Sequence, residues 1–495
     1  MCIPQVQSDS YAENGVKQQT GNTIYREHER SAYPMATVGS KVKTAAISAA
    51  INQALKYLEK DPEQNVPKLM DLVDKLVPDD WYAPQRAAIR DAIDRKTNYY
   101  DMIMKIYQLD PGVRESFFRN FITNASLKGS ARQFEIADKY NCNVPWAILM
   151  DPTSACNLKC TGCWAAEYGH QLNLTYEDLD RIVNEANDLG CYMFIFTGGE
   201  PLVRKKDIIK LCEAHPDSEF LSFTNGTLID EEFCQDMLRV RNFVPAISLE
   251  GFEEANDGRR GNGVYNKVMN AMNLLKEHKL AFGISVCYTS KNVDDVSSDK
   301  FIDGIVDKGA LFVWFFHFMP VGMNATPELM VSPEQRVQMY HAVRHFRATK
   351  PIFAMDFQND GQYVGGCIAG GRKYLHINAG GAVEPCVFIH YSNVNIHDVS
   401  LLDALRSPIF QAYHDNQPFN DNMYRPCPML ENPTALPKLV KETGAVNTDY
   451  MDPESADHLC AKTEQYAKNW APVAEKLWAE DVARKEAKKA AEAAK

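Results

Sequence analysis

Between residues 141 and 350, short apolar runs alternate with longer segments of helical periodicity. The runs that fit buried strands span residues 146–151, 191–197, 219–224, 243–249, 281–288 and 311–318. The segments between them, such as 175–189 and 265–279, are long enough to cross back over a sheet. Thr175, followed by Asp178, has the spacing of a helix cap. The pattern predicts six β–α units around a parallel sheet, which fit an open barrel with ligands at the carboxyl ends of its strands.

The regions on either side of this barrel (141–350) have other patterns. Residues 1–40 are polar and irregular, and we expect a loosely ordered arm there. Residues 41–140 predict an α-helical domain. Its apolar faces consist of Ile47, Ile51, Leu55 and Leu58 and of Val66, Leu69, Met70, Val73 and Leu76. A glycine-rich region over 351–465 includes a predicted hairpin with strands 374–378 and 382–385, and residues 466–495 form a charged helical tail.

Composition narrows the range of functions. The chain has 495 residues, of which 45% are apolar, and a net charge of −12. This charge argues against a surface devoted to nucleic-acid phosphates. The most apolar stretch, residues 310–321, is shorter than the ~20 residues of a membrane span, and no secretory signal is visible. We therefore expect a cytoplasmic protein without a membrane span, whose 13 cysteines stay reduced and suit metals better than disulfides.

Three cysteines follow the first predicted strand at very short spacing. Cys156, Cys160 and Cys163 are separated by three and then two residues, so they cannot pair into disulfides without leaving one over. Thiolates this close can converge on one metal ion or one iron–sulfur cluster, and three ligands to a four-iron cluster leave one iron open for a substrate or cofactor. A structural zinc site is the alternative, and it needs a fourth protein ligand.

Small polar residues follow the next three predicted strands. The second strand ends in Thr197-Gly198-Gly199-Glu200-Pro201, where glycines let the backbone approach a ligand closely. The third ends in Thr224-Asn225-Gly226 and the fourth in Ser248-Leu249-Glu250-Gly251. Arg259 or Arg260, a little further on, could bind a carboxylate in bidentate fashion, although exposed arginines are an equal alternative.

The CxxxCxxC spacing of Cys156, Cys160 and Cys163 resembles the signature of the radical S-adenosylmethionine (radical SAM) superfamily. The Gly198-Gly199-Glu200-Pro201 turn is similar to the family's GGEP motif. This resemblance implies a partial (β/α)6 TIM-type barrel and a [4Fe-4S] cluster held by the three cysteines. It also implies SAM contacts from Gly198, Gly199, Glu200, Asn225, Ser248 and Arg260. Many family members have an aromatic residue where this chain has Gly162, and Trp164 is a candidate replacement for the adenine contact.

A second set of cysteines lies in the glycine-rich region: Cys367, Cys386, Cys427 and Cys460. Four thiols with little apolar sequence around them suggest a metal-stapled subdomain. With Gly381 and residues 395–398 and 407–410, Cys367 and Cys386 resemble the SPASM/twitch extension, which holds auxiliary iron–sulfur clusters. The resemblance implies a single auxiliary cluster with Cys427 as a third ligand. The fourth ligand is Cys460, water or substrate, or the fourth position has no ligand.

The resemblance implies an enzyme that reductively cleaves SAM to a 5′-deoxyadenosyl radical, which abstracts hydrogen from a substrate. The Ser248 to Gly251 turn is similar to that of enzymes that modify peptides, so a peptide or protein side chain is the first substrate class. A small molecule or lipid precursor is the alternative. A flavodoxin- or ferredoxin-type protein would donate electrons. The alternative to an enzyme is a non-catalytic iron–sulfur electron carrier or a zinc-stabilised protein. No catalytic acid or base is assigned, and we expect His317 and Cys287 to be structural.

Overall fold

The computed structural model describes residues 61–76 and 83–493. The expected arm at 1–40 and the apolar face from Ile47 to Leu58 lie outside the described residues. One sheet of nine strands, in the order β7-β6-β5-β4-β3-β2-β1-β8-β9, forms the centre of the molecule. Its strands are β1 (Ala147–Met150), β2 (Met193–Phe196), β3 (Glu219–Thr224), β4 (Phe243–Ser248), β5 (Gly283–Tyr288), β6 (Phe312–His317), β7 (Phe353–Asp356), β8 (Tyr374–Ile377) and β9 (Val383–Glu384).

Strands β1 to β8 pair with one another in parallel. The predicted hairpin is β8 with β9, which pair antiparallel. The six predicted strands are β1 to β6 in sequential order, which confirms the partial barrel of β–α units. The sheet continues beyond residue 350, because β7 adds to β6 and β8 pairs with the outer edge of β1. Residues from the glycine-rich region are therefore part of the same sheet as the cysteine loop.

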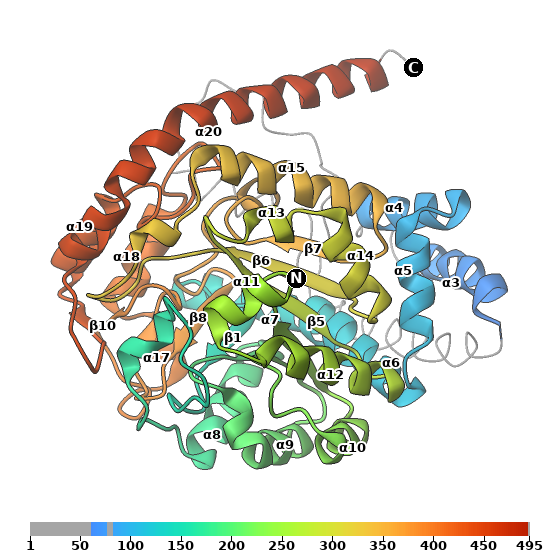
Figure 1. Cartoon of the computed structure of the whole chain (residues 1–495), viewed down its shortest axis with the longest axis horizontal. Helices are drawn as coiled ribbons and strands as arrows, with labels where there is room; N and C mark the ends of the chain where they lie inside the picture. The colour runs from blue at the N-terminus through green and yellow to red at the C-terminus, as the bar shows by residue number, and fades with distance from the viewer. Residues whose placement is uncertain (1–60, 77–82, 494–495) are drawn as a thin grey trace.

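Helices cover the outer face of the sheet (Figure 1). They are α8 (Tyr176–Asp188), α9 (Lys205–Ala214), α10 (Glu231–Val240), α12 (Val264–Glu277), α13 (Val293–Val296), α14 (Asp299–Asp307) and α15 (Pro333–Thr349). Helix α11 (Glu253–Arg260) lies at the carboxyl end of the sheet, where the Arg259 carbonyl accepts from the Thr161 N–H. The predicted cap of α8 is a capping box, in which the Thr175 hydroxyl accepts from the Asp178 N–H and the Asp178 carboxylate accepts from the Thr175 N–H. Phe315 of β6 points outward, and its ring lies 6.3 Å from that of Phe346 on α15.

The helices before the barrel divide into two groups. The first, α3 (Pro62–Leu76), α4 (Ala83–Arg95) and α5 (Asn98–Tyr107), stands at one side of the molecule (Figure 1). It buries a small apolar cluster of its own with Val66, Met70, Ile93 and Tyr100. The second consists of α6 (Pro111–Phe117), the π-helix η1 (Phe118–Lys128) and α7 (Gly129–Tyr140), whose buried residues join the main core.

Helix η1 packs beside the amino ends of β1 to β3. Phe121 lies edge-on to Trp146, with ring centroids 5.5 Å apart. Asn120 donates to the carbonyls of Pro216 and Ser218, just before β3. These contacts cover the amino end of this part of the sheet, whereas the cysteine loop lies at the carboxyl end.

The last part of the chain wraps back over the barrel. It contains α16 (Gly361–Val364), β10 (Tyr391–Ser392), α17 (Leu401–Leu405), α18 (Pro408–Asn416), α19 (Ala435–Thr443), β11 (Val446–Asn447) and α20 (Ala456–Ala493). Helix α20 runs beside α15 (Figure 1), and its Trp470 is fully buried. In the ranges 61–76 and 83–493, no helix combines the length and the apolar character needed to cross a bilayer.

A buried ionic triad joins β1 to the β8–β9 hairpin. His376 on β8 donates to Asp151, directly after β1, at 2.9 Å and to Glu384 on β9 at 2.7 Å. All three side chains are fully buried. Burial opposes the charged imidazole, yet the two carboxylates raise the pKa of His376 to about 10. The histidine is therefore an imidazolium at neutral pH.

Replacing this histidine, His376→Gln, is expected to lower the free energy of unfolding by about 3 kcal/mol or more, because two carboxylates then stay buried without their cation. The matched control is His397→Gln, whose exposed ion pair with Asp178 contributes at most about 0.5 kcal/mol. Urea unfolding followed by circular dichroism measures both. Equal losses in the two variants would contradict the prediction.

The same triad predicts a pH dependence. The folded pKa of His376 is raised from 6.5 to about 10, so its stabilisation is complete below pH 6.5 and is lost as the pH rises toward 10. The stability difference between wild type and His376→Gln should therefore narrow over that interval in urea titrations. A constant or widening difference would show that the imidazolium is not the source.

Candidate functional site

The cysteine loop follows β1 at the carboxyl end of the sheet. Cys156, Cys160 and Cys163 are free thiols, all half-buried, and the three interact electrostatically with one another. The Leu158 N–H donates to the Cys156 sulfur at 3.4 Å. Burial raises the pKa of the Cys156 thiol to about 11. A metal centre would have to supply the positive charge that keeps such buried thiols deprotonated.

The glycine turn after β2 holds the start of this loop. The Gly199 N–H donates to the Thr153 carbonyl at 3.0 Å, and the Glu200 N–H donates to the Ala155 carbonyl at 2.8 Å. Gly198 has a φ of +98°, which favours glycine. A Cβ atom on Gly199 would lie 2.2 Å from the Ala155 oxygen, so a side chain there would displace the loop. The two backbones approach one another as closely as glycine allows.

The Glu200 carboxylate is turned into the protein. It accepts from the Leu202 N–H at 3.0 Å, the Thr224 hydroxyl at 2.6 Å and the Asn225 N–H at 2.7 Å. The Asn225 side chain in turn donates to Asn157 in the cysteine loop at 2.8 Å. Glu200 and Asn225 therefore join the ends of β2 and β3 to the cysteine loop. Backbone atoms of the turn are the groups left to meet a ligand.

Two arginines close the other side of the loop. Glu250 is fully buried and accepts from Arg259 at 2.5 Å, from Arg260, and from the Cys287 N–H at 3.0 Å. Burial alone would raise the pKa of Glu250, but the two guanidinium groups hold it below its usual value. Arg260 also donates to the Cys160 sulfur at 3.9 Å. The arginine pair thus brings positive charge to the thiols.

Gly162 and Phe318 occupy complementary positions. Gly162 has a φ of +66°, and a Cβ atom on it would lie 2.5 Å from the Phe318 ring, which follows β6. Phe318 therefore fills the space that a side chain at position 162 would take. Trp164 instead packs against the C-terminal part of the chain, with its ring 5.8 Å from His376 and 6.2 Å from Phe388.

Ser248 and Cys287 lie on the concave face of the sheet and are half-buried. Cys287 interacts electrostatically with Arg259 and Cys163, so it belongs to the site and not to the core that we expected for it. His317 points the other way, toward the helices, where its ring contacts Tyr466 at 5.1 Å. Burial lowers its pKa to about 3, which agrees with a neutral structural histidine.

Three of the C-terminal cysteines lie together. Cys367 interacts electrostatically with Cys386 and with Cys427. Backbone N–H groups donate to the sulfur of Cys386 at 3.5 Å and to that of Cys427 at 3.4 Å, as at Cys156. Hydrogen bonds of this kind tune the sulfur ligands of iron–sulfur clusters. Tyr413 is fully buried, and its hydroxyl has no hydrogen-bond partner in the described parts of the chain although its ring lies near these thiols.

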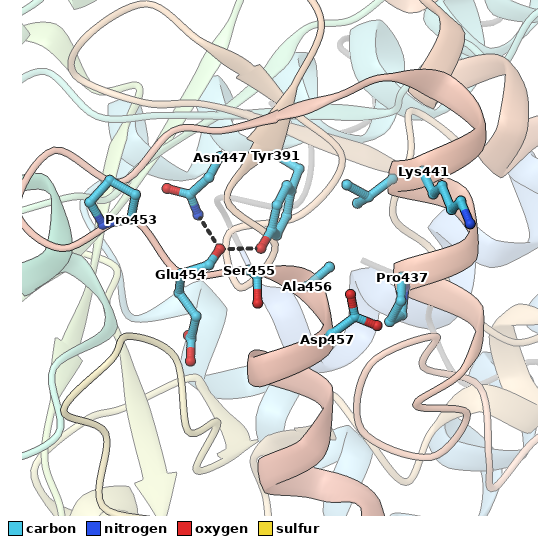
Figure 2. Close-up of a pocket in the computed structure, with 10 residues that line it drawn as sticks. Tyr391, Pro437, Lys441, Asn447, Pro453, Glu454, Ser455, Ala456 and Asp457 are labelled. Carbon is cyan, nitrogen blue, oxygen red and sulfur yellow. Dashed lines mark hydrogen bonds between the residues drawn. The ribbon is translucent and has the colours of Figure 1, made fainter.

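Cys460 is buried on α20, with Asp457, Glu454 and Lys462 as charged neighbours. Tyr413 lies near Cys460 as well as near the other three thiols. A cavity of about 410 Å³ lies close by, between α19, β11 and the start of α20 (Figure 2). Tyr391 and Asn447 both donate to the Glu454 carbonyl at its wall. None of the residues expected from the sequence to bind a ligand lines this cavity.

The sulfur atoms of both thiol groups have polar neighbours. The thiols are free, half-buried or buried, and two of the three in each group lie beside N–H or guanidinium donors. Such donors suit the thiolate ligands of an iron–sulfur cluster. Over residues 61–76 and 83–493, no group of three His, Cys, Asp or Glu side chains is arranged to hold a single metal ion.

Comparison with known proteins agrees with this geometry. Residues 150–299 match the model of the radical SAM superfamily. The matched residues begin at the end of β1 and include the cysteine loop, the glycine turn and the arginine pair.

Two relatives and one solved structure indicate how far the likeness extends. The chain is 26% identical over 183 residues to Fe-coproporphyrin III synthase of Methanosarcina barkeri, covering 36% of this chain and 45% of that protein. It is 31% identical over 176 residues to a cysteine-type anaerobic sulfatase-maturating enzyme of Clostridium perfringens, covering 31% and 47%. It thus spans less than half of either relative. Streptococcus suis SuiB, solved with S-adenosylmethionine and with precursor peptide SuiA, has the same fold. For the S-adenosylmethionine complex the TM-score is 0.52 at 16% identity, and the match covers 67% of this chain and 81% of SuiB.

Sequence reasoning missed Cys287, Phe318 and Tyr413. A strict alternation along the fifth predicted strand places Ser285 and Cys287 on one face, which is the signal that could have found Cys287. Phe318 lies after its strand and Tyr413 lies on α18, so their places depend on contacts with distant segments.

Gly199→Ala is expected to weaken iron retention at the cysteine loop about tenfold or more, since the added Cβ pushes against the Ala155 carbonyl. Gly304→Ala on α14 is the control, because a Cβ there meets nothing within 4 Å. Iron bound after anaerobic reconstitution and gel filtration is measured for both. Full iron retention by Gly199→Ala would mean that the close backbone approach does not position the cysteines.

Proposed function

We propose that this chain is a radical SAM enzyme, in which Cys156, Cys160 and Cys163 hold a [4Fe-4S] cluster that binds SAM. The observation that carries the proposal is the three-thiol loop clamped between the glycine turn and the Glu250–arginine group. When bound and reduced, the cluster supplies one electron to SAM, which yields methionine and a 5′-deoxyadenosyl radical for hydrogen abstraction.

The residues around the loop have separate roles in this proposal. Gly198 and Gly199 present backbone groups to the amino end of SAM, and Glu200 and Asn225 position that turn. Arg260 offers its guanidinium to the SAM carboxylate, and Ser248 lies on the concave face beside the ligand. Phe318, which is buried, fills the space that an aromatic side chain at position 162 would take. Together they position SAM and exclude water from a reactive carbon radical.

The C-terminal thiols are proposed as the ligands of one auxiliary iron–sulfur cluster. Cys367, Cys386 and Cys427 form the core of the set, and Cys460 is the fourth candidate. The buried Tyr413 hydroxyl without a hydrogen-bond partner in the described residues supports a group that the protein alone does not supply there. An external flavodoxin- or ferredoxin-type protein would provide electrons, and a reducing cytoplasmic setting suits such centres.

For the substrate we propose a peptide or protein side chain. SuiB, which shares the fold, has been solved with a bound precursor peptide, and one relative is a sulfatase-maturating enzyme. A small molecule or lipid precursor is the second candidate, and the aromatic concave face of the sheet would suit an apolar one.

The proposal predicts 5′-deoxyadenosine when the reconstituted protein receives SAM and a strong reductant under anaerobic conditions. The triple variant Cys156→Ala/Cys160→Ala/Cys163→Ala should form none, because the cluster loses every protein ligand. Cys234→Ala, which removes a buried thiol on α10, is the control and should keep the activity. Chromatography quantifies the nucleoside. A triple variant as active as the control would refute the assignment. A loaded but inactive wild type would favour a non-catalytic iron–sulfur carrier, or an enzyme that releases the radical only when substrate is bound.

The auxiliary site is tested by iron content in the triple-variant background. That protein should retain roughly four iron atoms per chain, the content of one cluster. Adding Cys386→Ala should remove most of this iron, whereas adding Cys212→Ala, a buried thiol on α9, should not. Cys460→Ala in the same background tests the fourth ligand, since a loss of iron assigns that role to it. Iron that survives Cys386→Ala would refute the auxiliary set.

A further inference from the structure

The concave face of the sheet has side chains that are only partly buried. Along β5, half-buried Ser285 and Cys287 alternate with buried residues such as Val286. Along β6, Trp314 and Phe316 are half-buried in the same way, and they pair in register with Ser285 and Cys287. Since successive side chains of a strand point to opposite faces, and Phe315 packs outward on α15, these residues point inward.

Four aromatic rings form one surface on this face, which we call the aromatic wall: Phe223, Trp314, Phe316 and Phe357. The ring centroids are 5.7 Å apart for Phe223 and Trp314, 5.2 Å for Trp314 and Phe316, and 5.4 Å for Phe316 and Phe357. All four side chains are half-buried. Such rings offer a large apolar contact area in defined orientations.

The wall extends toward the cysteine loop. The ring of Phe388 lies 6.4 Å from that of Phe357 and 6.2 Å from that of Trp164, which follows Cys163. Phe318, two residues after Phe316, meets Gly162 just before the same cysteine. A group resting on the wall would therefore lie against the inner face of the sheet on the side of the proposed SAM site.

The wall offers little to a charged ligand. The half-buried residues beside it, Ser248, Ser285 and Cys287, are uncharged thiol or hydroxyl groups at neutral pH. Glu219, at the amino end of β3 on the same face, is buried, and burial raises its pKa to about 8. The two arginines of the site are bound to Glu250, and Arg260 also donates to Cys160, so their charge is directed to the cysteine loop. A phosphate or ammonium group on the wall would lose hydration without gaining a partner.

We infer that the aromatic wall binds an uncharged, apolar side chain of the substrate and presents its C–H bond to the SAM site. The inference rests on the proposed function and deepens it. For a peptide substrate, the modified residue is then aliphatic or aromatic, and serine, charged residues and phosphate-bearing groups are disfavoured. Trp314 and Phe316 act as specificity-determining residues, because they supply the centre of the wall.

The experiment measures binding without turnover. The anaerobically reconstituted enzyme with SAM and no reductant is mixed with blocked amino-acid amides, and saturation-transfer NMR reports the contact. N-acetyl-leucinamide and N-acetyl-phenylalaninamide should bind at least about tenfold more tightly than N-acetyl-lysinamide or N-acetyl-glutamic acid amide. Decanol tests an acyl chain as the source of the apolar group. Equal binding of charged and apolar probes would overturn the inference.

Matched variants locate the contact. Trp314→Ala should weaken the apolar probes about tenfold, and Trp314→Phe should keep them within about threefold because it retains an aromatic ring. Trp478→Ala removes a tryptophan of α20 that packs on Tyr424, and it should leave probe binding unchanged. If Trp314→Ala does not fold by circular dichroism, Phe316→Leu replaces it with the same expected direction for the aromatic probe. Unchanged binding in the wall variant would overturn the assignment.

The outcomes separate the wall from the function on which it rests. Apolar probes that bind while the wild type forms no 5′-deoxyadenosine with reductant, either with or without the probes, would support the wall and count against radical SAM catalysis. Decanol bound far more tightly than either amide would support an apolar wall and overturn the peptide side chain as its occupant. Failure of every apolar probe in a protein that does form 5′-deoxyadenosine would overturn the wall alone.

Discussion

A histidine shared by two buried carboxylates relates the two thiol groups of this protein to each other. Asp151 lies five residues before Cys156, and Glu384 lies two residues before Cys386. Because His376 binds both acids away from water, moving one strand relative to the other would leave a buried charge without its partner. The positions of the cysteine loop and of the C-terminal thiols therefore depend on the same imidazolium. Tyr168, just beyond the loop, adds a hydrogen bond to Glu384 at 2.8 Å.

Charge compensation is as strict on the other side of the loop. Arg259 and Arg260 are largely withdrawn from water, and one buried carboxylate, Glu250, faces both. Its second oxygen reaches the Cys287 N–H on the neighbouring strand. The pair and the acid together leave one net positive charge beside the thiols. This positive charge would stabilise the negative thiolate ligands of a metal centre, whereas neutral thiols would gain little from it.

Much of this architecture was accessible from sequence, for physical reasons that can be named. Six apolar runs separated by helical segments allow few arrangements, because a parallel crossover needs a covering helix, so β1 to β6 followed from periodicity. The cysteine and glycine motifs could be placed because carboxyl ends of parallel strands share one edge. The pairing of β8 with β1 joins residues over 200 positions apart, and no local pattern encodes it. The orientation of Cys287, by contrast, follows from strand parity and was open to sequence reasoning, whereas the place of Cys460 near Tyr413 depends on where α20 packs.

The contact between Gly162 and Phe318 has a consequence for how this loop can vary. One aromatic ring occupies the space beside the third cysteine, and here it comes from the strand end opposite instead of from the loop itself. Only one of the two positions can carry a ring, because both side chains would occupy the same space. A larger residue at 162 requires a smaller residue at 318 and a backbone at 162 that no longer needs a φ of +66°. The aromatic ring could therefore move from position 318 to position 162 only if both residues were substituted. A larger residue at 162 alone would collide with Phe318, and a smaller residue at 318 alone would leave a void.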